Sequence, residues 1–256
     1  MIPLSIVYLT YNSSRTLRAS LQSITGIGQE VLVVDSGSSD DTLEIANSFG
    51  ARVLNHSWEG FAKQRNWALA QAINDWVLMM DSDEVLTSDG REKIQQLLQQ
   101  EPAVSAYFLM RYSVFHGRRI NFGDWRHDET LRIFDRRRGA YDPDDLVHES
   151  WHCEGKTGNL PGYALAHHSY ASLVQLMEKT QRYAELNAQL VKSRGHAISS
   201  WTPTTHAFWT FFRAYILRLG ILDGVDGAAI AWTTALGAFM KYAIAREMQL
   251  QDKENS

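Results

Sequence analysis

Three acids follow an apolar run in the segment WVLMMDSDEVL, residues 76–86. The run at 76–80 predicts a buried strand. Asp81 and Asp83 follow this run and are separated by one residue. If the chain turns there, both carboxylates reach one point, where oxygen ligands of this kind hold Mg²⁺. Such a cation neutralises a pyrophosphate and stabilises it as a leaving group. The alternative is an acidic turn that caps the helix expected from Ser88, and this spacing alone leaves both open.

Polar side chains also follow two other predicted strands. Asp35 ends the run VLVV, and a carboxylate there can accept hydrogen bonds from a base or from ribose hydroxyls. The first apolar run is followed by Thr10, Tyr11 and Asn12. Because parallel strands end at one edge of a sheet, all these groups converge, which indicates a site for a nucleotide and a metal. The chain has no G-x-x-x-x-G-K-[ST] and no G-x-G-x-x-G, which argues against an ATPase loop and a dinucleotide fold.

Strand and helix signals alternate through the first 100 residues. Apolar runs of strand length lie at 3–9, 30–34, 52–55 and 76–80. Helix signals lie at 13–24, 42–49, 63–72 and 88–100, and Asp40 or Asp41 can cap the second of these. This order predicts an α/β fold with a mostly parallel central sheet, covered by helices on both faces.

The second half of the chain has a different pattern. Strand signals at 106–115 and in TLRIFDRR predict mixed strands that finish the sheet. From Tyr170 onward helical spacing dominates, at 172–194 and again at 205–247. We therefore expect a catalytic domain of residues 1–170, divided near residue 100, and a C-terminal helical region of residues 171–256.

Composition sets outer limits on the function. The chain has 256 residues, 45% of them hydrophobic, which suits one large domain or one domain with a helical appendage. The net charge of −4 gives no general attraction to nucleic acid, so we expect none as a partner. The single cysteine, Cys153, excludes an internal disulfide and agrees with a reducing compartment. The start MIPLSIVYLTYN predicts a strand rather than a signal peptide, and we expect no membrane-spanning helix because no run of 18 apolar residues occurs.

Four segments together resemble family 2 glycosyltransferases of the GT-A fold, in order and in spacing, over residues 3–100. They are SIVYLTYNSSRTLRASLQSI, VLVVDSGSSDDT, GFAKQRNWALAQA and WVLMMDSDE. The resemblance implies a Rossmann-like sheet and the transfer of a sugar, with inversion, from a nucleotide diphosphate donor. It also implies a divalent metal, Mg²⁺ or Mn²⁺, as cofactor.

The resemblance also implies roles for single residues. Asp35 would contact the uracil of a UDP-sugar, Asp81 would touch ribose or sugar, and Asp83 would ligate the metal. The base pocket would be lined by Thr10, Tyr11 and Asn12, and the residues near the diphosphate or ribose would be Lys63, Arg65 and Asn66. For Lys63 and Arg65 the alternative is a solvated helix face.

Segments of the second half narrow the resemblance to a bacterial subgroup that extends the lipopolysaccharide inner core. These segments are the V-H-E of DPDDLVHESW, GDWRHDETLRIFDRR, YASLVQLMEKTQRYAELNA and YILRLGILDGVDG. The subgroup typically consists of β-1,4-glucosyltransferases that act on heptose. The resemblance therefore implies a UDP-sugar donor, with glucose as the first candidate, and a lipid-linked glycan acceptor.

Inversion by direct displacement needs a general base for the acceptor hydroxyl. Glu149 of the V-H-E segment is our first candidate, and Asp128 or Glu129 is the competitor. His148 is a second metal ligand, a group that orients Glu149, or a structural histidine. The pair at 167 and 168 can contact a phosphate, although histidines near a strand end are more often structural.

Basic residues are concentrated between residues 111 and 138, a segment that contains eight arginines and four acids. Such a patch can grip phosphorylated acceptor sugars, because the guanidinium fork matches phosphate. The alternative is a set of solvated strand edges, where positive charge discourages edge pairing. The arginines are 111, 118, 119, 126, 132, 136, 137 and 138.

Two mostly apolar segments, AFWTFFRAYILRLGIL and AAIAWTTALGAFMKYAIA, lie near the C-terminus. Both suit an amphipathic helix in the headgroup region of a membrane, with Arg and Lys reaching toward water. The alternative is a helical pair packed on the catalytic domain or in a dimer. We expect a cytoplasmic protein held peripherally on the inner face of the cytoplasmic membrane.

Other functions remain open at this point. A family 2 enzyme can use another acceptor, such as a polyprenyl phosphate, a capsule or another glycan. A module that binds a nucleotide sugar without turnover is a second class, which the intact Asp81–Asp83 pair argues against. A nucleotidyltransferase would need a glycine-rich phosphate loop near the N-terminus, and no such loop occurs.

Overall fold

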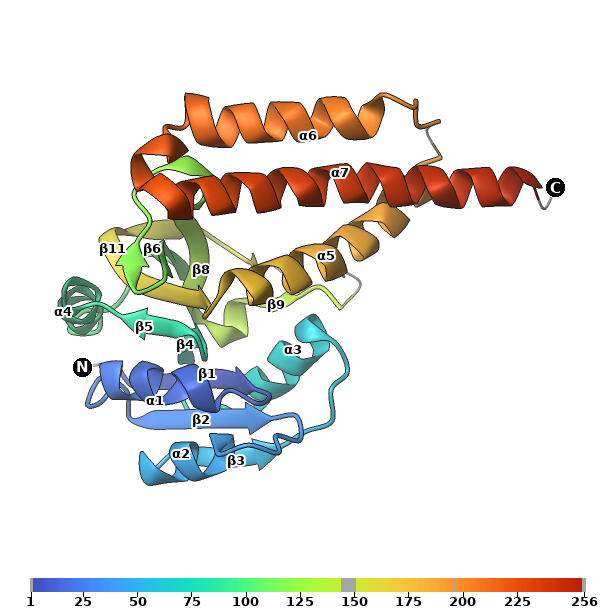
Figure 1. Ribbon diagram of the computed structural model, residues 1–256. Coiled ribbons are helices and arrows are strands. Elements are labelled where there is room, and N and C mark those ends of the chain that lie inside the picture. Colours follow the sequence, from blue (N-terminus) through green and yellow to red (C-terminus); the bar gives the residue numbers. More distant parts are fainter. Residues whose placement is uncertain (1, 144–150, 196, 255–256) are drawn as a thin grey trace. The chain divides into compact units, whose positions relative to one another are not determined.

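The computed structural model describes residues 2–143, 151–195 and 197–254 (Figure 1). The chain forms two compact units. The first unit consists of Met1–Tyr112 and Asp128–His168. The second unit consists of Ser113–His127 and Ser169–Ser256. The functional division that we predicted at residue 170 stays a prediction.

A mixed sheet forms the centre of the first unit, as the alternating strand and helix signals predicted (Figure 1). The four strands of the first half pair in parallel, in the order β3-β2-β1-β4. These strands are β1 (Leu4–Thr10), β2 (Glu30–Asp35), β3 (Arg52–Asn55) and β4 (Trp76–Asp81). Each is bounded as the apolar runs indicated, to within a residue or two.

Four further strands complete the sheet beyond β4, in the order β8-β6-β11-β5. They are β5 (Glu84–Leu86), β6 (Ala106–Phe115), β8 (Asp128–Asp135) and β11 (Thr157–Tyr170). The strand β8 pairs antiparallel with β4 and with β6, and β5 pairs antiparallel with β11. The two-residue β7 (Arg118–Arg119) pairs with the end of β6. A separate ribbon pairs β9 (Gly139–Tyr141) with β10 (Trp151–Cys153).

Helices cover both faces of the sheet, so its strands are apolar on both sides. On one face, Ile6 and Met80 pack with residues of α1, α2 and α4. On the other face, Val7 and Met79 pack with α3 and with Trp151. The helices are α1 (Ser14–Ser23), α2 (Thr42–Ser48), α3 (Phe61–Gln71) and α4 (Ser88–Leu97).

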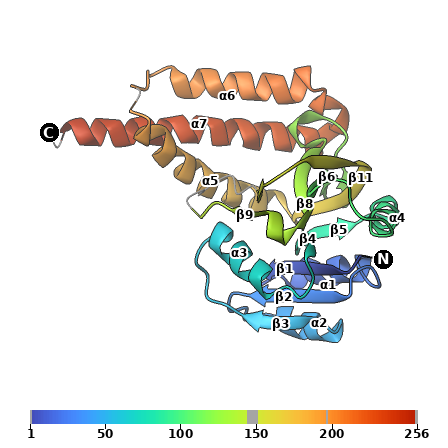
Figure 2. The same cartoon turned by 180° about the vertical axis from the view of Figure 1, so that it is seen from behind.

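The second unit is built around three helices, of which α6 and α7 run side by side in both views (Figure 1, Figure 2). These are α5 (Leu173–Ser193), α6 (Thr202–Phe212) and α7 (Gly224–Glu254). The helical region that we predicted at 205–247 is therefore divided. A π turn at Arg213–Leu217 and a 3-10 turn at Gly220–Asp223 reverse the chain, with Leu219 left-handed at φ 59°.

Acidic side chains fasten the loop 113–127 to this reversal within the second unit. Asp124 accepts hydrogen bonds from Arg213 (2.8 Å) and Arg218 (2.5 Å). The Asp223 carboxylate accepts from the backbone N–H groups of residues 121 and 122, and Asp226 pairs with His116 at 2.8 Å.

Glycines allow the backbone to pack closely at the same reversal. A Cβ on Gly227 would lie 1.9 Å from the carbonyl oxygen of Gly220. A Cβ on Gly220 would lie 2.7 Å from that of Ala214. Only a residue without a side chain fits at either position.

One helical stretch within the described residues, Gly220–Asp252, is long and apolar enough to cross a membrane, although we expected none. Only 28% of its most apolar part is buried in the structure. Length and composition are weak evidence, and α7 also contacts α5 and α6.

The contact between α4 and β11 tolerates no side chain at Gly90. A Cβ there would lie 2.5 Å from the carbonyl oxygen and 2.6 Å from the Cα of Ala164, and both are backbone atoms. We predict that Gly90→Ala lowers the free energy of unfolding by about 2 kcal/mol, because the helix has to move away from the sheet. Urea unfolding measures the change, and the exposed Gln96→Ala on the same helix is the control. Equal midpoints for the two variants would contradict this packing.

Candidate active site

The register of the parallel strands brings three predicted site residues to one edge of the sheet. Thr10 of β1 lies beside Asp35 of β2, and Leu9 lies beside Asp81 of β4. The predicted convergence of strand ends is therefore present in the first unit, which makes this edge the candidate site.

Asp35 is fully buried, and both oxygens of its carboxylate accept hydrogen bonds from neighbouring protein groups. Oδ1 accepts from the backbone N–H groups of Gly37 (2.9 Å) and Ser38 (2.8 Å). Oδ2 accepts from the hydroxyls of Thr10 (2.8 Å) and Ser38 (2.5 Å). Asp35 therefore orders the loop after β2, and its contact with uracil stays a prediction.

A second set of hydrogen bonds joins the loops after β1 and β2. The Asn12 N–H donates to the Ser38 hydroxyl at 2.8 Å, and Asn12 Oδ1 accepts from the Ser39 N–H at 2.9 Å. Asn12 takes a left-handed φ of 48°, which asparagine adopts more readily than most residues. Tyr11 beside it is 64% exposed, so its ring is accessible to a ligand.

Asp40, rather than Asp41, bonds to the start of α2. Its carboxylate accepts from the N–H groups of Thr42 (3.1 Å) and Ser14 (3.0 Å). Burial raises the pKa of Asp40, but hydrogen bonds from Thr42 and Ser14 outweigh this and lower the pKa to about 2. Asp40 therefore stays ionised and connects the starts of α1 and α2.

The acids after β4 meet arginines from two strands and a helix. Glu84 is fully buried, and its Oε1 accepts from Arg111 at 2.7 Å and from Arg132 at 2.6 Å. Its Oε2 accepts from the backbone N–H of Asp81 at 3.1 Å. Arg132 also bonds to Asp81, and Arg65 of α3 lies 3.4 Å from Asp81. We call Asp81, Glu84, Arg65, Arg111 and Arg132 the charged cluster.

The arginines keep Asp81 ionised. Desolvation raises the pKa of Asp81, but the charges of Arg132, Arg65 and Arg111 outweigh this and hold the pKa well below its usual range. The same attraction raises the pKa of Arg132 despite its burial. About a third of the Asp81 side chain remains exposed (35%), so the carboxylate can accept a hydrogen bond from a ligand hydroxyl.

A histidine lies beside Asp83. The Nε2 atom of His167, on β11, lies 3.5 Å from Asp83 Oδ1, and both side chains are partly exposed. The backbone N–H of His168 donates to the Asp83 carbonyl at 2.8 Å. The histidine pair that we ranked low from sequence thus provides a neighbour for the predicted metal ligand. No group of three potential ligands gathers anywhere in the part of the chain that the structure describes.

The other predicted residues have varied positions. Asn66 exchanges two hydrogen bonds with the backbone of Tyr141, at 2.7 and 2.9 Å, so its amide joins α3 to β9. Lys63 is exposed at the start of α3. Asp128 is exposed, and its Oδ2 accepts from Nε and Nη2 of Arg111. His148 and Glu149 lie outside the described residues.

The sequence did not identify Glu84, Arg111 and Arg132 as parts of one cluster. Both arginines were counted in the basic patch, where we weighed a phosphate grip against solvated edges. Arg132 is only 3% exposed, so the solvated-edge interpretation is wrong for it. The available signal was an arginine within the apolar strand LRIF, where a charge needs a buried partner.

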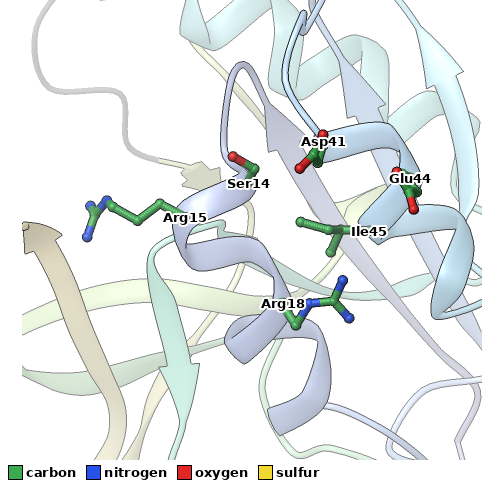
Figure 3. A pocket seen from close by; sticks show the side chains of 6 residues that line it. All are labelled: Ser14, Arg15, Arg18, Asp41, Glu44 and Ile45. Atoms are coloured by element: carbon green, nitrogen blue, oxygen red, sulfur yellow. The ribbon is translucent and has the colours of Figure 1, made fainter.

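A hollow of about 310 Å³ lies beside these loops, between α1 and the start of α2 (Figure 3). Arg18 and Glu44 contribute opposite charges to its lining, and Arg15 points away from the other side chains in Figure 3. Neither Asp81 nor Asp83 lines it. The hollow is therefore separate from the acids of the candidate site.

Comparisons with known proteins agree on one family. The family profile described as "Glycosyl transferase family 2" matches residues 5–155. The chain is 26% identical to the lipopolysaccharide core biosynthesis glycosyltransferase LpsC of Rhizobium meliloti (strain 1021), over 98% of this chain and 97% of that protein. It is 27% identical to an uncharacterized glycosyltransferase of Rickettsia prowazekii (strain Madrid E), over 99% of this chain and 90% of that protein.

A solved structure has a similar fold. The mannosyltransferase PcManGT from Pyrobaculum calidifontis, in complex with GDP-Man and Mn²⁺, matches with a TM-score of 0.50. The match covers 99% of this chain and 88% of that chain at 17% identity. At this identity the likeness concerns the fold alone, and it agrees with the predicted α/β architecture.

The charged cluster generates a prediction on stability. We expect Arg132→Met to lower the free energy of unfolding by about 3 kcal/mol, because Glu84 then keeps a buried charge with one partner fewer. Denaturant unfolding measures the loss, and Lys93→Met, which breaks a solvent-exposed ion pair with Asp89 in the same unit, should change stability little. The double variant Glu84→Gln/Arg132→Met should recover part of the loss. Equal stability of Arg132→Met and Lys93→Met would show that the cluster does not stabilise the fold.

Proposed function

Because the chain belongs to glycosyl transferase family 2, we propose that it moves a hexose, with glucose the first candidate, from a UDP-sugar to a heptose of the lipopolysaccharide inner core. The chain is a glycosyltransferase, and the GT-A fold that we expected from its sequence is confirmed. The observation that carries the proposal is the meeting of Thr10, Asp35 and Asp81 at the carboxyl edge of the parallel strands. That edge is where open α/β sheets bind their ligands.

The donor would lie along this edge. Asp35 and Asn12 order the loops beside which a base would bind, and the exposed Tyr11 offers it a ring. Asp81, which its arginines keep ionised, would accept hydrogen bonds from ribose or sugar hydroxyls. Lys63 and Arg65, from α3, would supply positive charge toward the diphosphate.

The metal would be held by Asp83, with His167 as the neighbouring nitrogen donor. The carboxylate oxygen of Asp83 suits Mg²⁺ or Mn²⁺, and the imidazole nitrogen of His167 lies 3.5 Å from it, where it could share the ion. When bound, the cation would neutralise the diphosphate as it leaves. The Mn²⁺ and GDP-Man bound to the mannosyltransferase with the similar fold support a metal-dependent donor site. His148 stays the alternative second ligand.

Inversion would need a single displacement assisted by one base. Glu149 is our first candidate. Asp128 is held through Oδ2 by Arg111, so only Oδ1 is available to take a proton from the acceptor, which makes it the second choice. The similarity to LpsC, named for lipopolysaccharide core biosynthesis, supports the acceptor class. Polyprenyl phosphate, capsule or another glycan is the alternative acceptor, and donor binding without turnover is the alternative function.

Because the proposed acceptor is lipid-linked, we also propose that the second unit holds the protein peripherally on the inner face of the cytoplasmic membrane. Exposed apolar side chains on α6 and around the chain reversal support this, among them Phe208 (70%), Leu222 (62%) and Val225 (85%). Arg118 and Arg119, in the loop that Asp223 fastens to the reversal, are also exposed and can meet anionic headgroups.

We predict that the purified chain releases nucleoside diphosphate from one UDP-sugar in the presence of Mg²⁺ or Mn²⁺. The assay covers UDP-glucose, UDP-galactose, UDP-N-acetylglucosamine and GDP-mannose, each with and without truncated lipopolysaccharide core. Release should increase with the core, and NMR of the product should show an inverted anomeric centre. No release with any donor, despite measurable UDP binding, would favour the binding-module function.

Asp83→Ala tests the metal in the same assay. We expect release to fall to background and EDTA to have the same effect, because the leaving diphosphate loses its cation. Asp89→Ala removes an exposed carboxylate that pairs with Lys93 and should leave the rate unchanged. Full activity of Asp83→Ala, or full activity in EDTA, would rule out the metal role.

The membrane proposal predicts that Leu222→Glu/Val225→Glu releases the protein from inner-membrane fractions, because two new charges oppose insertion. Val174→Glu, at an exposed apolar position on α5, is the control and should stay bound. A double variant that pellets like the wild type would contradict this surface. Resistance of the wild type to carbonate extraction would instead support a spanning α7.

A further inference from the structure

A cavity of about 350 Å³ lies wholly within the second unit, among α5, α6 and α7. This volume is within the range of small-molecule sites, roughly 300–1,000 Å³. No proposed role of the donor site involves this cavity. Its lining includes Trp125, Tyr170, Lys179, Tyr183, Asn187 and Lys241.

The cavity carries positive charge that no acid in its lining neutralises. Lys179 and Lys241 both line it, and within the described residues neither has an ion-pair partner. By contrast, Lys192 on the same helix as Lys179 pairs with Asp252 at 2.8 Å. Two ammonium groups beside one cavity favour a ligand with an anionic group, and lysine is a common partner of phosphate.

Aromatic rings lie beside both lysines, and the Tyr242 ring centre, outside the lining, lies 4.5 Å from the Lys241 ammonium. The ammonium of Lys179 lies 5.0 Å from the ring centre of Tyr170 and 6.0 Å from that of Tyr183. The rings of Trp125 and Tyr170 stack at 5.2 Å with an interplanar angle of 16°. A cation–π contact holds an ammonium in place and leaves its N–H groups able to donate hydrogen bonds to a ligand. A wall of this kind offers flat apolar faces to the C–H side of a sugar ring.

Small and polar residues complete the cavity. A Cβ on Gly237 of α7 would lie 3.0 Å from Thr180 of α5, so these helices approach closely at that point. Asn187 donates through Nδ2 to the Tyr183 carbonyl at 2.8 Å, which leaves Oδ1 to accept from a ligand. The hydroxyl of Thr180 donates to the Leu176 carbonyl and can likewise accept. The site thus offers donors for a phosphate and acceptors for hydroxyl groups.

We infer that this cavity binds a phosphorylated sugar, as a site for the phosphate-bearing part of the acceptor glycan. The acceptor role rests on the proposed function, whereas the binding of a sugar phosphate does not. Lys179 and Lys241 contact the phosphate, and the Trp125–Tyr170 wall packs against the ring.

Binding is measured by titration calorimetry on the full chain, in EDTA so that a metal-held donor site does not contribute. The probes are mannose 6-phosphate, mannose and inorganic phosphate. We expect mannose 6-phosphate to bind more tightly than either of the others, because it alone uses both the lysines and the aromatic wall. Lys179→Met and Lys241→Met should each weaken its binding about tenfold or more.

Lys192→Met is the matched control, because it removes a lysine of α5 that does not line the cavity. It should bind mannose 6-phosphate like the wild type, and all three variants should keep the thermal midpoint of the wild type. Undetectable binding, or equal binding in all variants, would overturn the inference. Loss of binding in Asp83→Ala would do so too, because the ligand would then occupy the donor site. Lysine-dependent binding in a protein that releases no nucleoside diphosphate would refute the proposed function and leave this site in place.

Discussion

The buried carboxylate of Glu84 is the constraint on which the first unit depends. A charge without access to water needs partners close by, and Glu84 has them in Arg111 and Arg132. Glu84 follows the last parallel strand, whereas the arginines come from antiparallel strands of the second half. One ionic contact therefore joins the parallel half of the sheet, where we propose that the donor binds, to the half that completes the sheet. The same arginines keep the Asp81 carboxylate ionised. The residues that join the two halves of the sheet therefore also determine the charge of Asp81.

The sequence was informative where local rules decide the outcome. Apolar runs gave the four parallel strands, and the topology of parallel sheets then required Thr10, Asp35 and Asp81 to meet at one edge. It was uninformative where partners are distant along the chain. Glu84 and Arg132 are 48 residues apart, and His167 reaches Asp83 from β11, a strand whose bounds we did not predict. Gly158, Pro161 and Gly162 interrupt that segment, yet tertiary pairing makes it a strand of 14 residues.

The two units place different demands on their charged side chains. In the first unit, arginines and acids neutralise one another around Asp81, so the carboxylate is ready for a ligand but strongly held. In the second unit, three aspartates fasten a loop, and two lysines beside a cavity have aromatic rings as their neighbours. In this unit, aspartates form the ionic and hydrogen-bonded contacts that hold the loop. The two lysines beside the cavity make no such contact among the described residues, which is why we assign them a role in binding.

The segment GILDGVDG resembles a signature, yet it contributes no group to the candidate active site. Its glycines at 220 and 227 lie where backbones touch, and its aspartates at 223 and 226 bond to the loop 113–127. These eight residues therefore determine how the helical hairpin of the second unit reverses. Their contacts among the described residues hold backbone and loop in place and involve none of the candidate site residues. A relative that carries the same segment is expected to share this reversal of the chain, whatever sugar it transfers.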